Sequence, residues 1–403
     1  MFTVRFLALM SVVSMVFSFV FGLPKQQRFI SEHSQDSSIV RLAWQPNGIL
    51  VAAGTTNGQV SLFNIVSGTT STNNMYTSGV DAITWSPNGQ QFATVDESGD
   101  VVIWNDRLQV IRTFSLASPD EVAPGLTEML WSPDGQILAS IGNNGLATWD
   151  TSTGTRLNWY FDERFNLSSI AWNTDGSIIA VGSATGEITF RDAQTFEVID
   201  VLPPAERTSL ITGLFWHEIG GQIAASTILG EVLIWDVPTK QIVARLASDS
   251  SPILALDWDD SSGWLASSSP NGITRIWDVD QQIVVVAYAL GGSAHDVAWS
   301  PYGGQLAIAE LFPTATAIYG EVSFDDLRVI VPDPSLERLQ SIAAQCDAPL
   351  TVTDAIPQVE QPAALTDFVA QVTALPEGTI PPACAADLIA VAGAMAEAIS
   401  AGH

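Results

Sequence analysis

Seven copies of one pattern dominate the middle of this chain. Each copy combines alternating apolar residues, a tryptophan and a polar turn, as in LTEMLWSPDG from Leu126 and LSSIAWNTDG from Leu167. The tryptophans of the seven copies are Trp44, Trp85, Trp131, Trp172, Trp216, Trp258 and Trp299. They recur every 41 to 46 residues, a period that suits four short antiparallel strands and their turns. The alternation of apolar and polar residues excludes a helical repeat.

A second and a third strand follow each of these tryptophans. The third strands include GDVVIWN from Gly99 and GEVLIWD from Gly230. Asn-Gly pairs open three of the third strands, at Asn57-Gly58, Asn144-Gly145 and Asn271-Gly272. Such pairs are typical of tight hairpins in which both central residues have positive φ. The sequence therefore predicts an all-β fold built from hairpins.

The ends of the third strands carry the residues of a known repeat. Three of these strands end in a tryptophan-aspartate pair, namely Trp149-Asp150, Trp235-Asp236 and Trp277-Asp278. In these pairs the chain resembles the WD-repeat family over about residues 26–332. The resemblance implies a seven-bladed β-propeller with four-stranded antiparallel blades, an arrangement that hides the edges of its sheets. A related exported family, similar to TolB, shares the WSPDG type of strand and is the alternative classification.

The chain departs from the family pattern at two points. In the family, a strand before the first copy completes the last blade, and residues 27–31 suit that place. The last copy has TATAIYG (314–320) where a third strand is expected, and residues 321–331 compete for the closing place. No copy has the family's Gly-His pair, so its buried hydrogen-bond tetrad cannot be carried over. We expect the blades to depend on apolar packing and Asn-Gly turns.

The start of the chain lies outside the repeat. Residues 6–23 are uncharged and apolar, follow Arg5, and lead to small residues near Gly22. These features predict a secretory signal peptide over residues 1–22. An uncut N-terminal membrane anchor is the alternative, because 18 apolar residues reach the lower limit for a span. We expect an extracytoplasmic protein, secreted or held at the cell envelope, that contacts a membrane only through an uncleaved segment.

Residues 333–403 predict a small helical module after the propeller. Apolar residues at helical spacing mark three helices, which begin near Asp333, Leu365 and Cys384. We interpret the module as a cap on one propeller face, because small helical units rarely stand alone. An adaptor for another extracytoplasmic protein is the alternative.

The chain has two cysteines, Cys346 and Cys384, and both lie in this module. Export to an oxidising compartment favours a disulfide between them, which would close a loop of about 40 residues and contribute about 3 to 4 kcal/mol in the chain-entropy model. Two buried free thiols are the alternative. A metal site is less favoured, because neither cysteine has a second ligand at metal spacing.

Composition excludes one class of partner. The chain has 43 acidic and 15 basic residues and a formal net charge of −28 at pH 7. It therefore lacks the basic stripe that a nucleic-acid backbone requires. A hydrophobic fraction of 47% with 14% charged residues is also unlike intrinsic disorder.

The sequence offers no clear catalytic or cofactor site. The four histidines include no pair at metal-ligand spacing, and neither GxSxG nor HExxH is present. Residues 96–100, DESGD, gather three acids but lack calcium-loop spacing, which favours a solvated hairpin. The segment DTSTGTRLNW (150–159) looks like a quinone-docking motif, but it occurs once. Eleven of the 13 tryptophans follow the repeat and are interpreted as core and turn packing; Trp159 and Trp264 do not follow it.

We therefore predict a non-enzymatic, exported scaffold with no catalytic, cofactor or metal site. We expect a monomer whose protein partners, not identified by the sequence, bind loops on one face of the ring. The alternative is an extracytoplasmic, metal-dependent hydrolase or lactonase-like propeller that uses carboxylates and a metal at the channel mouth. Fold alone does not decide between them.

Overall fold

The structure is a computed structural model of the 403-residue chain. It describes residues 27–29, 38–116, 126–142, 145–161, 167–204, 209–217, 221–248, 250–259, 262–289, 292–302, 305–311, 327–330, 336–346, 362–376 and 379–400. The predicted signal segment, residues 1–22, lies outside these residues. No helix in the described part of the chain is long and apolar enough to cross a membrane.

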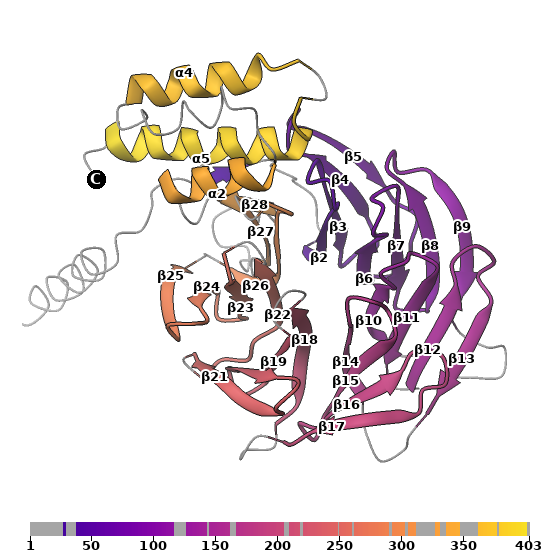
Figure 1. Cartoon of the computed structure of the whole chain (residues 1–403). Helices are drawn as coiled ribbons and strands as arrows, with labels where there is room; N and C mark the ends of the chain where they lie inside the picture. The colour runs from indigo at the N-terminus through magenta and orange to yellow at the C-terminus, as the bar shows by residue number, and fades with distance from the viewer. Residues whose placement is uncertain are drawn as a thin grey trace, which may run out of the picture.

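Six blades follow one another around a ring, and each is an antiparallel sheet of four consecutive strands (Figure 1). The first three blades comprise β2 (Ile39–Trp44), β3 (Leu50–Thr55), β4 (Val60–Asn64) and β5 (Thr69–Asn73); β6 (Val80–Trp85), β7 (Gln91–Asp96), β8 (Asp100–Asn105) and β9 (Val110–Ser115); and β10 (Leu126–Trp131), β11 (Ile137–Gly142), β12 (Gly145–Asp150) and β13 (Arg156–Tyr160). The next three comprise β14 (Leu167–Trp172), β15 (Ile178–Ser183), β16 (Ile188–Asp192) and β17 (Val198–Leu202); β18 (Ile211–His217), β19 (Gln222–Thr227), β20 (Glu231–Asp236) and β21 (Gln241–Ala247); and β22 (Ala255–Asp259), β23 (Trp264–Ser268), β24 (Ile273–Asp278) and β25 (Ile283–Ala289).

One further four-stranded sheet joins the two ends of the repeat region. All its strands are antiparallel, and we call it the mixed sheet only because its strands come from both ends of that region. Its strands, in spatial order, are β1 (Gln27–Phe29), β28 (Leu327–Ile330), β27 (Leu306–Leu311) and β26 (Ser293–Trp299). Strand β1 pairs antiparallel with β28, so residues 27–29 take the outer place expected for them. The expectations for the last copy were wrong, because residues 327–330 pair with β27 as the third strand instead of competing for the closing place. Residues 314–320 lie outside the described residues.

The fold is therefore an all-β propeller with four-stranded antiparallel blades and few helices. Its core is distributed over the interfaces between neighbouring sheets. Between the first blade and the mixed sheet, for example, Val51, Ala53 and Phe63 pack with Ala307 and Ala309. Buried alanines of the second strands, such as Ala53 and Ala93, lie in these interface clusters beside larger side chains such as Phe63 and Trp131.

The hairpin turns differ from the predicted type. Gly58 and Gly272 have φ of 84° and 79°, but Asn57 and Asn271 do not have positive φ. The amide of Gly58 instead donates to the carbonyl oxygen of Thr55 at 3.2 Å, which fits an ordinary turn followed by a glycine in the left-handed region. Asn144 lies outside the described residues.

Three helices form a compact module next to the mixed sheet (Figure 1). They are α2 (Leu336–Gln345), α4 (Pro362–Thr373) and α5 (Pro382–Ser400). Their shared core includes Leu339, Phe368 and Leu388, and Tyr302 from the mixed sheet packs against it. A disulfide joins Cys346 to Cys384, with 6.1 Å between their Cα atoms.

Candidate functional site

The first-strand tryptophans hold neighbouring sheets together. The indole nitrogen of Trp85 donates to the carbonyl oxygen of Ala43 in the preceding blade at 3.0 Å, and that of Trp131 donates to Thr84 at 3.2 Å. The same bond closes the ring, because Trp44 donates to Ala298 of the mixed sheet at 2.8 Å. The other four, Trp172, Trp216, Trp258 and Trp299, are buried or partly buried on the equivalent strands. Hydrogen bonds between sheets are therefore made by Trp44, Trp85 and Trp131, whereas the buried indole nitrogens of Trp172, Trp258 and Trp299 have no hydrogen-bond partner among the described residues.

The third-strand tryptophans lie in a buried polar network that we did not expect. Trp104, Trp149 and Trp277 donate to the hydroxyl oxygens of Thr94, Ser140 and Ser267, at 2.8, 2.9 and 2.8 Å. In the second blade the hydroxyl of Tyr76 adds a bond to Thr94 at 2.7 Å. The expectation that the blades depend on apolar packing and turns was therefore wrong for these three blades. The prediction rested on the missing Gly-His pair and did not take the serine and threonine residues of the second strands into account.

The aspartates of the tryptophan-aspartate pairs cap the next turn. Asp150 accepts hydrogen bonds from Ser152 and Thr153, Asp236 accepts from Thr239, and Asp278 accepts from Gln281. The bonds from the Ser152 and Thr239 groups hold the pKa of Asp150 and Asp236 below the usual value. These carboxylates are structural.

Trp235 breaks the third-strand pattern. Ala225 occupies the position that Thr94, Ser140 and Ser267 hold in their own blades, and Trp235 is 1% exposed. Its indole nitrogen has no hydrogen-bond partner among the described residues. A buried donor without a partner costs free energy, so this blade contains a correctable defect.

We expect Ala225→Ser to raise the free energy of unfolding by about 1 kcal/mol, because the new hydroxyl can accept the Trp235 bond. Urea unfolding followed by tryptophan fluorescence measures the change. The matched control is Ala53→Ser in the first blade, because Ala53 holds the repeat position of Ala225 and Phe63, whose ring has no N–H donor, holds that of Trp235. Equal effects of the two substitutions would contradict the explanation.

Charged residues gather at one repeat position on the innermost strands. Arg41, Glu128 and Asp296 each lie three residues before a first-strand tryptophan. One Glu128 oxygen accepts bonds from the Ser169 hydroxyl and the Ile170 amide, both at 2.8 Å. These partners lie on the next blade, so the carboxylate caps a neighbouring strand.

Asp296 makes the same kind of bond across the ring closure. It accepts a bond from the amide of Leu42 at 2.9 Å, and Asp257 accepts one from the amide of Trp299. The guanidinium of Arg41 donates to the carbonyl oxygens of Asp81 and Val40, at 2.6 and 2.9 Å. These bonds therefore bridge adjacent innermost strands. We call Arg41, Glu128 and Asp296 the channel charges.

Burial shifts the acidity of the channel carboxylates. It raises the pKa of Glu128 to about 7, against the bonds from Ile170 and Ser169 and the charge of Arg41, which lower it. Burial also raises the pKa of Asp296 to about 6, again opposed by Arg41. The raised pKa values bring the titration of both groups closer to neutral pH, although each carboxylate also accepts a hydrogen bond from a backbone amide of a neighbouring sheet.

The described residues of the chain contain no cluster of metal-binding side chains. No group of three or more His, Cys, Asp or Glu side chains in this part of the chain could hold a metal ion. Asp96 of the acidic turn is buried, and its oxygens accept bonds from Ser78, Ser98 and Asp100. The turn is a hairpin in which Glu97, Ser98 and Asp100 are exposed, as a solvated hairpin requires, while Asp96 is buried and caps the turn from inside.

Apolar side chains are exposed on the outermost strands of the third and fourth blades. Leu157, Trp159 and Phe161 alternate along β13 and its end and are 53%, 45% and 44% exposed. The rings of Trp159 and Phe161 stack with centroids 6.0 Å apart. On β17 of the next blade, Ile199 and Val201 are also exposed. We call Leu157, Trp159 and Phe161 of the third blade the rim patch.

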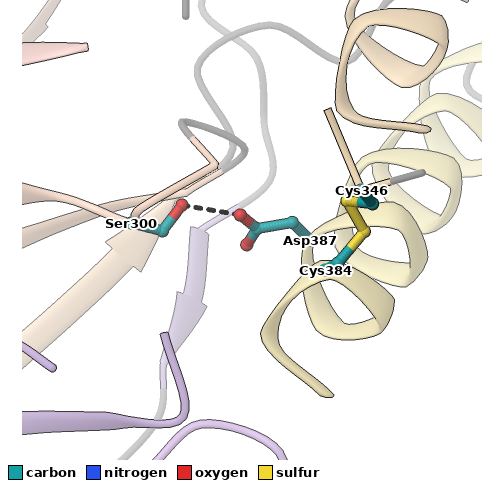
Figure 2. The surroundings of a disulfide bond; sticks show 4 residues. All are labelled: Ser300, Cys346, Cys384 and Asp387. Carbon is teal, nitrogen blue, oxygen red and sulfur yellow. Dashed lines mark hydrogen bonds between the residues drawn. A yellow bond between two sulfur atoms is a disulfide. The ribbon is translucent and has the colours of Figure 1, made fainter. Parts of the chain in front are cut away.

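The helical module is fixed to the mixed sheet by a buried carboxylate. Asp387 of α5 accepts one hydrogen bond from the Ser300 hydroxyl at 2.8 Å and another from the side-chain amide nitrogen of Gln305 at 2.7 Å. Figure 2 shows Asp387 pointing from α5 toward Ser300, one helical turn away from the disulfide at Cys384. Asp387 is 2% exposed.

Sequence reasoning did not single out the channel charges or Asp387. The channel charges share one repeat position, so an alignment of the seven copies at that position would have found them. The signal for Asp387 was an acidic residue within an apolar, Ala-rich helix.

Comparisons with known proteins concern the propeller. A family model described as the anaphase-promoting complex subunit 4 WD40 domain matches residues 12–88, and one described as WD domain, G-beta repeat, matches residues 240–278. Among solved structures, the β-propeller domain of Cps50 (Swd1) from Myceliophteria thermophila is similar, with a TM-score of 0.62 and 13% identity. The match covers 75% of this chain and 99% of that one. At this identity the likeness concerns the fold.

Proposed function

Since this chain is a WD40-repeat β-propeller, we propose that it is a non-enzymatic, exported scaffold that binds a protein partner. In this proposal the mixed sheet is the seventh blade, because Trp44 and Leu42 make the same inter-sheet bonds to it as other blades make to each other. The charged channel residues are used to bridge strands, so they support a rigid ring in place of chemistry.

The rim patch is the observation that carries this proposal. Single exposed apolar residues are normal on a protein surface, but grouped aromatic and aliphatic side chains mark interaction sites. Trp and Phe side chains supply large contact areas at interfaces. Trp159 is also a tryptophan that the repeat does not require. The partner that fits is a protein with an apolar contact surface.

Site-specific crosslinking tests the proposed function. A photoreactive phenylalanine analogue at position 159, introduced in the producing cell, is expected to give a discrete crosslinked protein. The control position is Ile283 on β25, which is 49% exposed on another blade. The additional substitution Leu157→Ser should remove the product at position 159. Equal, diffuse crosslinking from both positions would contradict a partner at the rim patch.

We propose in addition that residues 1–22 direct export and are removed. The expected mature protein begins at Leu23, and mass spectrometry of the intact protein from the cell envelope or medium measures this directly. Recovery of the protein in the cytoplasm with residues 1–22 attached would contradict the proposed localisation.

A further inference from the structure

We propose that the helical module is a disulfide-dependent latch on the mixed sheet, in which Asp387 completes a turn that the propeller cannot complete alone. The described residues of this turn, which lies between β26 and β27, are Ser300, Pro301, Tyr302 and Gln305. This device is separate from the proposed binding at the rim patch.

In the second and third blades this turn also begins with a serine, and there it carries its own acceptor. In the second blade the Ser86 hydroxyl bonds to Asn88 at 2.9 Å, and in the third the Ser132 hydroxyl bonds to Asp134 at 2.6 Å. The serine lies directly after the first-strand tryptophan, and the acceptor follows two residues later. Both copies therefore close the turn with residues next to each other in the chain.

The last copy lacks this acceptor. Its sequence is WSPYGG, so Tyr302 stands where Asn88 and Asp134 stand in the other copies. The Ser300 hydroxyl bonds instead to Asp387, which is 87 residues further along the chain. Tyr302 packs against the core of the helical module. The two changes fit together, because the tyrosine helps to hold the module that supplies the missing carboxylate.

The disulfide holds Asp387 in place. Cys384 lies on α5 one helical turn before Asp387, and its partner Cys346 directly follows the last residue of α2. Small domains bury little of their surface and commonly need such a crosslink. Without the disulfide, the only covalent connection between α2 and α5 is the chain between them. The unfolded module then has more conformational entropy, so the folding of α5 becomes less favourable.

Reduction should therefore release the latch. A dithiol reductant transfers two electrons and two protons to the Cys346–Cys384 bond, leaving two thiols and the oxidised, cyclic disulfide of the reductant. Both cysteines are buried, so the module must open before the reductant reaches the sulfur atoms. Once the thiols form, the module no longer fixes Asp387 and the bonds to Ser300 and Gln305 are lost.

Hydrogen-deuterium exchange on the full chain tests this proposal. We expect treatment with dithiothreitol to accelerate amide exchange at least tenfold in residues 336–400 and also in the β26–β27 hairpin, residues 293–311. Residues 167–202, the fourth blade, should be unchanged. The double substitution Cys346→Ser and Cys384→Ser should reproduce the pattern without reductant, and wild type with reductant gives the answer if that variant does not fold.

Two results would overturn the latch. Faster exchange confined to the helices would show that the module melts while the hairpin keeps its own stability. If mass spectrometry confirms two free thiols and the amide exchange rates do not change, the disulfide does not hold Asp387. As a further variant, Tyr302→Asn restores an acceptor within the turn and is expected to protect the hairpin in the reduced protein, although the module still opens.

Discussion

Asp387→Ala is expected to lower the free energy of unfolding by about 3 kcal/mol. The substitution removes two hydrogen bonds to a buried carboxylate and leaves the hydroxyl of Ser300 and the amide of Gln305 without an acceptor. Bonds to charged groups contribute about 1.5 to 3 kcal/mol each, and orphaned buried donors add a penalty. Urea unfolding followed by tryptophan fluorescence measures the loss, since Trp299 directly precedes Ser300.

Matched variants separate this bond from a general effect of charge. Asp367→Ala removes an exposed acid from α4 of the same module and is expected to change stability little. Tyr302→Asn should recover part of the loss when it is combined with Asp387→Ala, because the turn then has its own acceptor. If Asp387→Ala and Asp367→Ala have equal effects, Asp387 does not anchor the module.

The repeat made most of the fold predictable. A tryptophan every 41 to 46 residues, followed by glycine turns, was sufficient to place the strands, because strand periodicity and turn chemistry act locally. The amphipathic spacing around Leu339, Phe368 and Leu388 likewise located the helices that bury these residues. The closing sheet was predicted less well. Its third strand, β28, is separated from β27 by residues 312–326, and nothing local determines which of the candidate segments pairs.

The functional residues were less predictable for a physical reason. Glu128 and Asp296 are two among 43 acidic residues, and their importance comes from the strand that the next blade brings beside them. Asp387 and Ser300 lie 87 residues apart, so no spacing rule connects them. The missing acceptor in WSPYGG was the one local sign that this turn is completed from elsewhere. A departure from a repeat therefore carried more information about function than the repeat itself.

Glu128 is expected to make the protein less stable as the pH rises from about 5 to 8. Burial raises the pKa of Glu128 in the folded state to about 7, above its usual value of 4.5. Between these values the folded protein binds the proton more tightly than the unfolded chain, so the free energy of unfolding falls with increasing pH. A difference of this size corresponds to about 3 kcal/mol over the interval, and Asp296 contributes with the same sign.

Glu128→Gln should remove the contribution of Glu128 and leave that of Asp296, because the amide does not ionise but still offers an oxygen to the Ile170 amide. The measurement is the free energy of unfolding of both proteins in urea at pH 5, 6, 7 and 8. We expect wild type to lose stability relative to the variant at each step, with most of the loss below pH 7. Glu197→Gln, at an exposed turn position outside the channel, controls for the loss of one negative charge from a highly acidic protein. Parallel pH profiles for wild type and Glu128→Gln would mean that Glu128 is hydrated in the folded state, and the channel would then be wetter than its hydrogen bonds between neighbouring strands imply.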